Sequence, residues 1–188
     1  MKQSVASSVV ALLLCGVVTW IFWDDVEYFF QRSVPVELGP AAEIEPGALA
    51  HNRFVSVKGI ADYRVQFAEA GGKTYRYFIL LGSKILVQQL TTTTVSRGEP
   101  WNYAGTGRLL SLSKTLKYDQ FLKHLRDNPP RIDLSSGGYI LLDGERPRDV
   151  WLYFAIVCVA IGIAVFSVIR NFVLSKGGGP VVSSNAER

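Results

Sequence analysis

Few residues of this 188-residue chain have the type and spacing that a reaction or a metal ion would need. Its two histidines, His51 and His124, stand far apart, and neither has a second ligand at a metal-binding spacing. The pair Ser113-Lys114 shares residue types with serine–lysine catalysis but lacks the surrounding motif. We therefore predict no catalytic residue and no metal ligand, and we expect a protein that is not an enzyme.

The stretch Gly105-Thr106-Gly107-Arg108 has two of the three glycines of a dinucleotide-binding fingerprint. That fingerprint opens a helix, whereas an apolar run typical of a strand follows here. We interpret the stretch as the start of a strand and predict no cofactor.

Basic and aromatic residues alternate over residues 74–81, where Arg76 lies between Tyr75 and Tyr77. One face of a strand with this composition could stack on bases and bind nucleic acid, although ordinary packing in a sheet is the alternative that we favour. Residues 24–149 contain 16 basic and 15 acidic side chains, so the positive excess of the chain lies in its tails. We therefore predict no nucleic-acid partner.

Two uncharged apolar runs are each long enough to cross a membrane as a helix. The first is Val5 to Trp23, which ends in aromatic residues before Asp24, and the second is Val150 to Ile169. About 20 helical residues span the roughly 30 Å of a hydrocarbon core. A cleaved signal peptide is the alternative for the first run, but no small-residue cleavage pattern follows it.

The two cysteines, Cys15 and Cys158, lie inside these runs, so no disulfide can stabilise the region between them. Small residues in the second run can allow another helix to approach closely, although such residues are common in membrane spans in general. They are Ala155, Ala160, Gly162 and Ala164.

Charges that flank the two runs predict their orientation. Lys2 precedes the first run and acidic residues follow it, whereas Arg170 and Lys176 follow the second. The positive-inside rule then places both termini in the cytoplasm and the central domain outside it, as in a two-pass protein of a bacterial inner membrane. Arg146 and Arg148, on the domain side of the second run, reduce this asymmetry.

Between the runs, a proline- and glycine-rich linker precedes a series of strand signals. Strands are predicted at residues 54–58, 63–67, 74–81, 85–88, 107–112 and 139–142, with a loop at 91–103. Tyr118, Phe121, Leu122 and Leu125 recur at helical spacing and predict one helix, whose opposite side is basic. That basic side could lie on a membrane surface, but packing of the helix on the sheet is the commoner arrangement.

These elements predict five or six antiparallel strands and one helix, arranged as a small barrel or curled sheet of the oligonucleotide/oligosaccharide-binding type. The expected division of the chain is an N-terminal tail 1–4, a first span 5–23, a linker 24–52, a soluble β-rich domain 53–149, a second span 150–169 and a flexible tail 170–188.

This layout resembles that of the Surfeit-locus cytochrome oxidase assembly family, in which a span near each end brackets an extracytoplasmic β-rich domain. Arg32 to Gly39 and then Arg53 to Gly59 follow a similar order of linker and strand. The resemblance implies a role in assembling a membrane complex. A second layout match is to membrane ubiquitin ligases with a domain beside the membrane, but their cysteine-rich zinc module has no counterpart in this tail.

We expect a membrane-anchored, non-enzymatic accessory or scaffold protein that presents its β-domain to other membrane proteins. Two alternatives stay open. One is a membrane-bound enzyme or small-ligand binder whose site the sequence does not reveal. The other is an oligomeric channel or transporter subunit, although neither apolar run holds the ionisable residues that ion pathways usually contain. The oligomeric state has no signature in the sequence.

Overall fold

The computed structural model describes residues 2–62, 64, 66–70, 72–92, 98–115, 123 and 138–176. Within it the chain forms two compact units, one of Met1–Val26 with Trp151–Arg188 and the other of Glu27–Val150. The helix predicted at residues 118–125 lies outside the described residues apart from Lys123, as do His124 and residues 63 and 65 of the strand predicted at 63–67.

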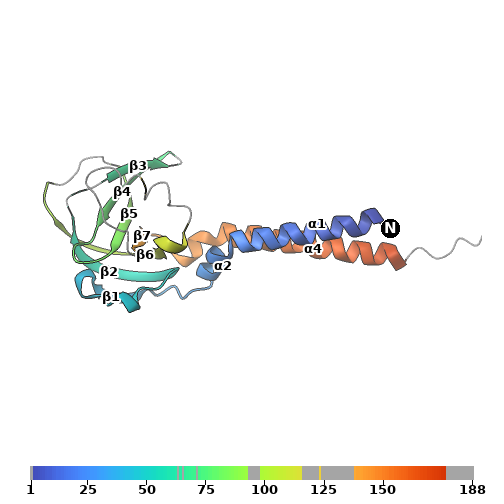
Figure 1. The fold of residues 1–188 in the computed structure, drawn as a ribbon, viewed down its shortest axis with the longest axis horizontal. Coiled ribbons are helices and arrows are strands. Elements are labelled where there is room, and N and C mark those ends of the chain that lie inside the picture. The colour runs from blue at the N-terminus through green and yellow to red at the C-terminus, as the bar shows by residue number, and fades with distance from the viewer. Residues whose placement is uncertain are drawn as a thin grey trace, which may run out of the picture. The chain divides into compact units, whose positions relative to one another are not determined.

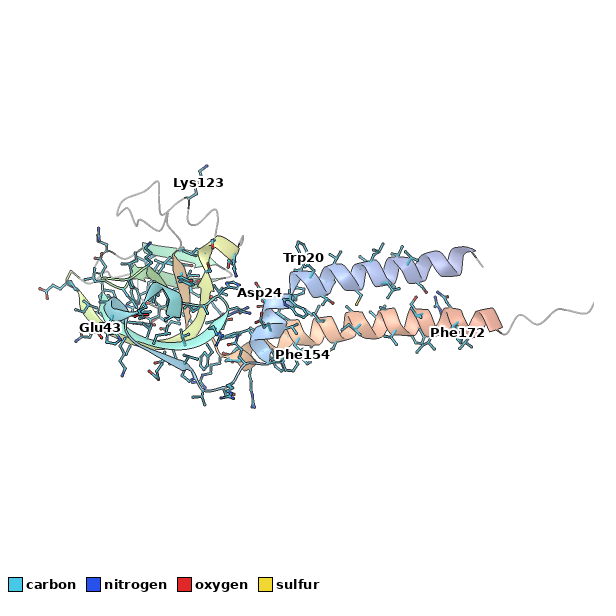
Figure 2. All side chains as sticks on the ribbon, turned by 60° about the horizontal axis from the view of Figure 1, so that its bottom comes forward. Trp20, Asp24, Glu43, Lys123, Phe154 and Phe172 are labelled. Carbon is cyan, nitrogen blue, oxygen red and sulfur yellow. The ribbon has the colours of Figure 1, made fainter. Side chains whose placement is uncertain are left out.

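The first unit is a pair of long apolar helices, α1 (Lys2–Ile21) and α4 (Trp151–Lys176), which run side by side (Figures 1 and 2). The stretch Pro147–Val173, with a mean hydropathy of 2.8, is long and apolar enough to cross a membrane. α1 passes the same test only together with α2 (Trp23–Phe29), from which a bend of 62° separates it. The first helix therefore ends two residues before the predicted boundary at Trp23.

Small and polar side chains line the seam between α1 and α4 at heptad spacing. Less exposed positions include residues 8, 11, 15 and 18 of α1, Phe22 just after it, and residues 157, 160, 164, 167 and 171 of α4. Alternating steps of three and four residues form the contact stripe of a helix pair that crosses at a shallow angle. Trp20, 82% exposed, and Phe172, 59% exposed, point away from this seam (Figure 2).

Contacts at both ends of the seam set its antiparallel register. The rings of Phe22 and Tyr153 stack with their centroids 5.3 Å apart. Two heptads away, Ser8 Oγ donates a hydrogen bond to the carbonyl oxygen of Ser167 at 3.3 Å and accepts one from Asn171 Nδ2. Polar side chains thus join the helices at the end that is opposite to the aromatic pair.

The second unit is built on one seven-stranded mixed sheet, in the order β1-β2-β6-β7-β5-β4-β3 (Figure 1). Its strands are β1 (Val36–Pro40), β2 (Arg53–Ala61), β3 (Gln66–Ala70), β4 (Lys73–Ile79), β5 (Ile85–Thr91), β6 (Trp101–Ser111) and β7 (Tyr139–Asp143). Short 3-10 turns lie at Ala41–Glu43, Pro46–Ala48, Leu112–Lys114 and Pro147–Val150. The strand signals at 54–58, 74–81, 85–88, 107–112 and 139–142 overlap β2, β4, β5, β6 and β7.

The sheet curls without closing, so the predicted barrel is wrong. β1 and β3 remain its two edges. The end of β2 does approach the turn after β4, where Asp62 N donates to the carbonyl oxygen of Ile79 and Leu81 N to that of Ile60, both at 2.8 Å. This contact is one isolated bridge and not a ladder along whole strands.

The expectation of a purely antiparallel sheet is also wrong. β1 pairs with β2, and β5 with β7, in parallel. Parallel neighbours need a long connection, and the one between β5 and β7 includes β6, which pairs with the other side of β7.

Two segments that were expected to be irregular contribute strands. β1 lies in the proline- and glycine-rich linker, where Gly39 and Pro40 are compatible with a strand that pairs on one side only. β6 begins at Trp101, inside the predicted loop, and Tyr103 belongs to it as well. Gly98, Glu99 and Pro100 precede β6 and do not belong to it.

The sheet has an apolar core on each face because successive residues of a strand point to opposite sides. One face buries Phe78, Val87, Leu109 and Leu141. The other face buries Tyr77, Leu86, Leu110 and Ile140. The strands are therefore apolar in consecutive positions, as strands covered on both faces are.

Candidate functional site

A row of polar side chains crosses the face of the sheet that buries Phe78, beside the apolar core of that face. Arg76 Nε donates to Gln89 Oε1 at 2.7 Å, and Gln89 Nε2 donates to Asp143 Oδ2 at 2.5 Å. β4, β5 and β7 are consecutive in the sheet, and Arg76 is directly opposite Gln89 in the register. A cation and a carboxylate from distant parts of the sequence are thus joined through one amide.

Two aromatic rings hold the guanidinium group of Arg76. Its Cζ lies 5.7 Å from the centroid of the Phe78 ring and 5.7 Å from that of Trp101. The two rings are 5.0 Å apart, and Phe78 is fully buried. A cation within about 6 Å of an aromatic face is attracted to it, so the rings and Gln89 together fix the position of Arg76.

Tyr103, in β6, completes this row, which we call the Arg76–Asp143 row. Its ring meets Phe78 edge to face at 5.4 Å. Its hydroxyl is buried beside the Asp143 carboxylate and makes no hydrogen bond of standard geometry within the part of the chain that the structure describes. Burial, and then the negative charge of Asp143, raises the pKa of the Tyr103 hydroxyl above its usual range.

Glycines in β6 make room for the row and for the next strand. A Cβ atom at Gly105 would lie 2.0 Å from Tyr103 Oη and 2.7 Å from Asp143 Oδ1, and one at Gly107 would lie 2.1 Å from the carbonyl oxygen of Leu142. These glycines lie inside β6 and not at its start, because the strand already begins at Trp101. Close packing accounts for both of them without a bound phosphate.

A second arginine, Arg108 of β6, is 5% exposed and forms its own cluster. Its Nε donates to Asn52 Oδ1 at 2.8 Å, and its Nη1 lies 3.2 Å from Glu145 Oε1. The guanidinium carbon is 4.5 Å from the centroid of the Tyr28 ring. A buried charge is stable only when it is paired and hydrogen-bonded, and Arg108 meets both conditions.

The Arg108 cluster ties together the two ends of the β unit. Tyr28 Oη donates to the backbone carbonyl of Glu145 at 2.8 Å, and burial raises the pKa of this hydroxyl with help from the Glu145 charge. Tyr28, Phe54 and Val150 form one buried apolar cluster. Since the unit is Glu27–Val150, its first and last residues meet at one place.

Of the residues considered for catalysis, the structure describes His51, Ser113 and Lys114. His51 Nδ1 accepts a hydrogen bond from Ser111 N at 3.0 Å, which ties this ring nitrogen to the backbone of the sheet. Ser113 and Lys114 are exposed in a 3-10 turn. Among the described residues, no group of three or more His, Cys, Asp or Glu side chains could hold a metal ion.

The sequence drew attention to Arg76, and packing in the sheet was the favoured interpretation of its segment. Arg76 was considered for an exposed basic face, whereas it is half-buried on the same side of the sheet as Phe78. Gln89 and Asp143 were not singled out, because neither shows an unusual local pattern. Only the order of the strands brings them to Arg76.

Comparison with known proteins identifies no relative: no family model, no curated protein and no solved structure matches the chain. The function must therefore be argued from the geometry. Both arginine clusters join their polar groups to one another inside the fold, which is an arrangement that stabilises a structure and does not by itself provide a reacting centre.

Proposed function

We propose that this chain is a two-pass membrane protein and a non-enzymatic accessory or scaffold, which holds a curled β-domain beside the membrane for another membrane protein to bind. One observation carries the proposal: Tyr28 and Val150, at the two ends of the β unit, pack in the same buried cluster. A domain inserted into a helical hairpin needs its ends close together. The antiparallel register of α1 and α4 supports such a hairpin.

The proposed location is a bacterial inner membrane with both termini in the cytoplasm. The flanking charges described above support this orientation. Trp20, Trp23 and Trp151, at the ends of the two helices that lie nearest to the domain in sequence, are exposed. Tryptophan side chains at such positions suit the headgroup region of a bilayer.

Assembly of a membrane complex is the specific role that the layout resemblance to the Surfeit-locus family suggests. Arg76 and Arg108 are both engaged with neighbouring side chains, so we assign neither of them to a reaction.

The proposal is tested by the mass of the particle that the full-length protein forms after extraction in a mild detergent. We expect a complex that contains a different membrane protein. A chain that always behaves as a lone monomer would contradict a scaffold role, whereas a stable homo-oligomer would favour the channel alternative. As a control, Ser8→Ala/Asn171→Ala removes the polar contacts of the helix seam without altering the β-domain, and should leave the complex in place if the domain makes the contact.

A small-ligand binder is the second candidate, and the buried hydroxyl of Tyr103 favours it. This hydroxyl, together with the Asp143 carboxylate, could be satisfied by a polar ligand. A thermal-shift screen with small polar metabolites would test this candidate. A ligand that raises the melting temperature of the full-length protein, but not of the Tyr103→Phe variant, is the expected positive result.

A further inference from the structure

A groove of about 380 Å³ lies on the β unit, where the chain passes from α2 to β1 and reaches the start of β2. Phe30 and Val34 line it and are 69% and 75% exposed. Arg32 and Arg53 are exposed along the same groove, and Glu27 adds one carboxylate. We call it the Arg32–Arg53 groove.

This groove combines features that rarely occur together on a soluble surface. Large apolar side chains normally avoid such exposure when they lie side by side, and a cluster of them marks a site of contact with a partner or a membrane. Neither Arg32 nor Arg53 forms an ion pair with another residue of the described chain. Their charges are therefore available to a negative group that comes from outside.

We propose that the Arg32–Arg53 groove binds the headgroup phosphate of an anionic phospholipid, with Phe30 and Val34 in the adjoining acyl region. This inference rests on the proposed anchoring of the chain in a membrane. α2 has seven residues and is roughly 10 Å long, and Arg32 follows its last residue by three. The chain therefore spans no more than about 20 Å from Trp23 to Arg32, which limits how far the groove can lie from the residue that we propose at the headgroups.

The composition of the groove favours a lipid over other occupants. A small free anion would use the arginines but would gain nothing from Phe30 or Val34. A lipid offers both a phosphate for the cations and apolar surface for the exposed side chains. Amphipathic surfaces with aromatic and basic residues bind bilayers through the same combination.

Lipid binding to the full-length protein tests the proposal. The protein is stripped of lipid in detergent, and native mass spectrometry measures its binding of phosphatidylglycerol and of phosphatidylcholine with the same acyl chains. We expect phosphatidylglycerol to bind more tightly. In the Arg32→Gln/Arg53→Gln variant this binding should weaken by roughly fivefold for each arginine, since one basic residue near an anionic surface contributes about that factor.

Matched variants separate the site from general charge effects. Lys58→Gln/Lys73→Gln removes the same charge from exposed positions elsewhere on the sheet and should leave phosphatidylglycerol binding unchanged. Arg32→Lys/Arg53→Lys should retain most of it. Equal binding of the two lipids, or equal weakening by both glutamine variants, would overturn the proposal. Competition by inorganic phosphate at the same affinity would also overturn it, because a soluble anion would then be the ligand.

A separate measurement distinguishes this inference from the proposed function. If the apolar helices anchor the chain, the wild-type protein and all variants remain in the membrane pellet after an alkaline carbonate wash. Release of the wild-type protein would overturn the anchoring itself. Retention without a preference for phosphatidylglycerol would overturn the lipid site alone.

Discussion

Arg108 illustrates at the scale of one residue how the fold accommodates a charge that it has buried. The guanidinium group has an amide, a carboxylate and an aromatic ring around it, contributed by three separate segments of the chain. Each partner alone offsets only part of the cost of removing the charge from water. The cluster is therefore sensitive to the loss of any one of its members.

Replacing Arg108 should destabilise the β-domain strongly. Arg108→Ala removes the guanidinium contacts of Glu145 and Asn52, and removal of one member of a buried ion pair costs about 3–5 kcal/mol. The lower end is expected, because the Glu145 side chain is 27% exposed. Arg53→Ala is the matched control, since this arginine is exposed on the neighbouring strand and should change stability by no more than about 0.5 kcal/mol. Chemical denaturation of the detergent-solubilised protein would measure both, and equal effects would contradict the argument.

The raised pKa values of the buried tyrosines predict how the free energy of unfolding changes at alkaline pH. Burial, with a smaller contribution from the charge of Tyr75, raises the pKa of Tyr77 to about 12, whereas the unfolded chain titrates near 10. Between these values the unfolded state releases a proton that the folded state retains, so the free energy of unfolding falls as the pH rises. Tyr28 and Tyr103, whose pKa values are also raised, act in the same direction.

The Tyr77→Phe variant isolates the part of this alkaline loss of stability that comes from the Tyr77 hydroxyl. Its free energy of unfolding should fall less steeply than that of the wild type between pH 10 and about 12, with parallel curves below pH 9. Denaturant titrations at a series of pH values would provide the comparison. Identical slopes above pH 10 would show that the Tyr77 hydroxyl is not protected by the fold.

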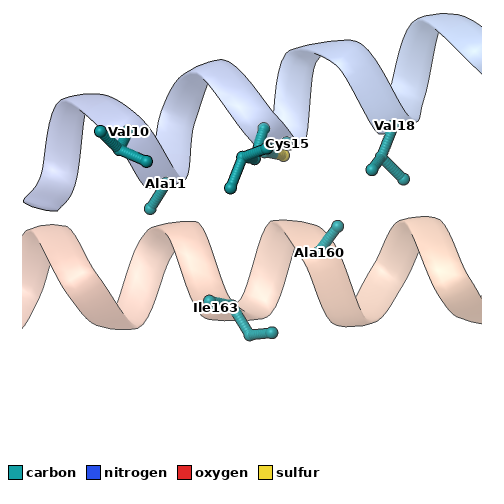
Figure 3. Close-up of a pocket in the computed structure, with 7 residues that line it drawn as sticks. Val10, Ala11, Cys15, Val18, Ala160 and Ile163 are labelled. Atoms are coloured by element: carbon teal, nitrogen blue, oxygen red, sulfur yellow. The ribbon is translucent and has the colours of Figure 1, made fainter.

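At the scale of the elements, the helix seam has a register that can be checked directly. The stacking of Phe22 on Tyr153 and the bond from Ser8 to Ser167 place Cys15 opposite Ala160, and both residues line one apolar groove (Figure 3). In a Cys158→Ala background, Ala160→Cys should therefore cross-link to Cys15 with a short bis-maleimide. Gly162→Cys should not, because Gly162 is exposed away from the seam.

Some elements were predictable from the sequence because local patterns specify them. Apolar runs between turn residues located five strands, and Gly82, which has a φ of +76°, lies in the turn between β4 and β5. Strand order was not predictable, since the insertion of β7 between β5 and β6 depends on contacts far apart in the sequence. β1 was hidden by its own Gly39 and Pro40, which are typical of loops.

The candidate sites also combine features that local sequence patterns reveal with contacts that only the strand order creates. Arg76 stood out among aromatic neighbours, but Gln89 and Asp143 belong to other strands and became its partners only through the register. In the helices, small residues were noticed in the second run alone. The heptad spacing that joins Ser8 to Ser167 and Asn171 appears only when both helices are compared in opposite directions.

At the scale of the whole molecule, the proposed topology predicts the behaviour of reporter fusions. Alkaline phosphatase, which is active only after export, should be active when inserted at Gly47, an open turn of the β-domain, and inactive when fused after Arg188. A cytoplasmic fluorescent reporter should show the reverse pattern. Activity of the exported reporter at the C-terminus would contradict the orientation that the flanking charges suggest.

The meeting of Tyr28 with Val150 also bears on how such a chain could change during evolution. A domain whose ends touch can be gained, lost or exchanged in one recombination event without moving the segments on either side. The aromatic stack of Phe22 and Tyr153 would still close α1 against α4, so a short turn in place of residues 27–150 would leave a complete hairpin. The helix pair and the β unit are thus separable modules.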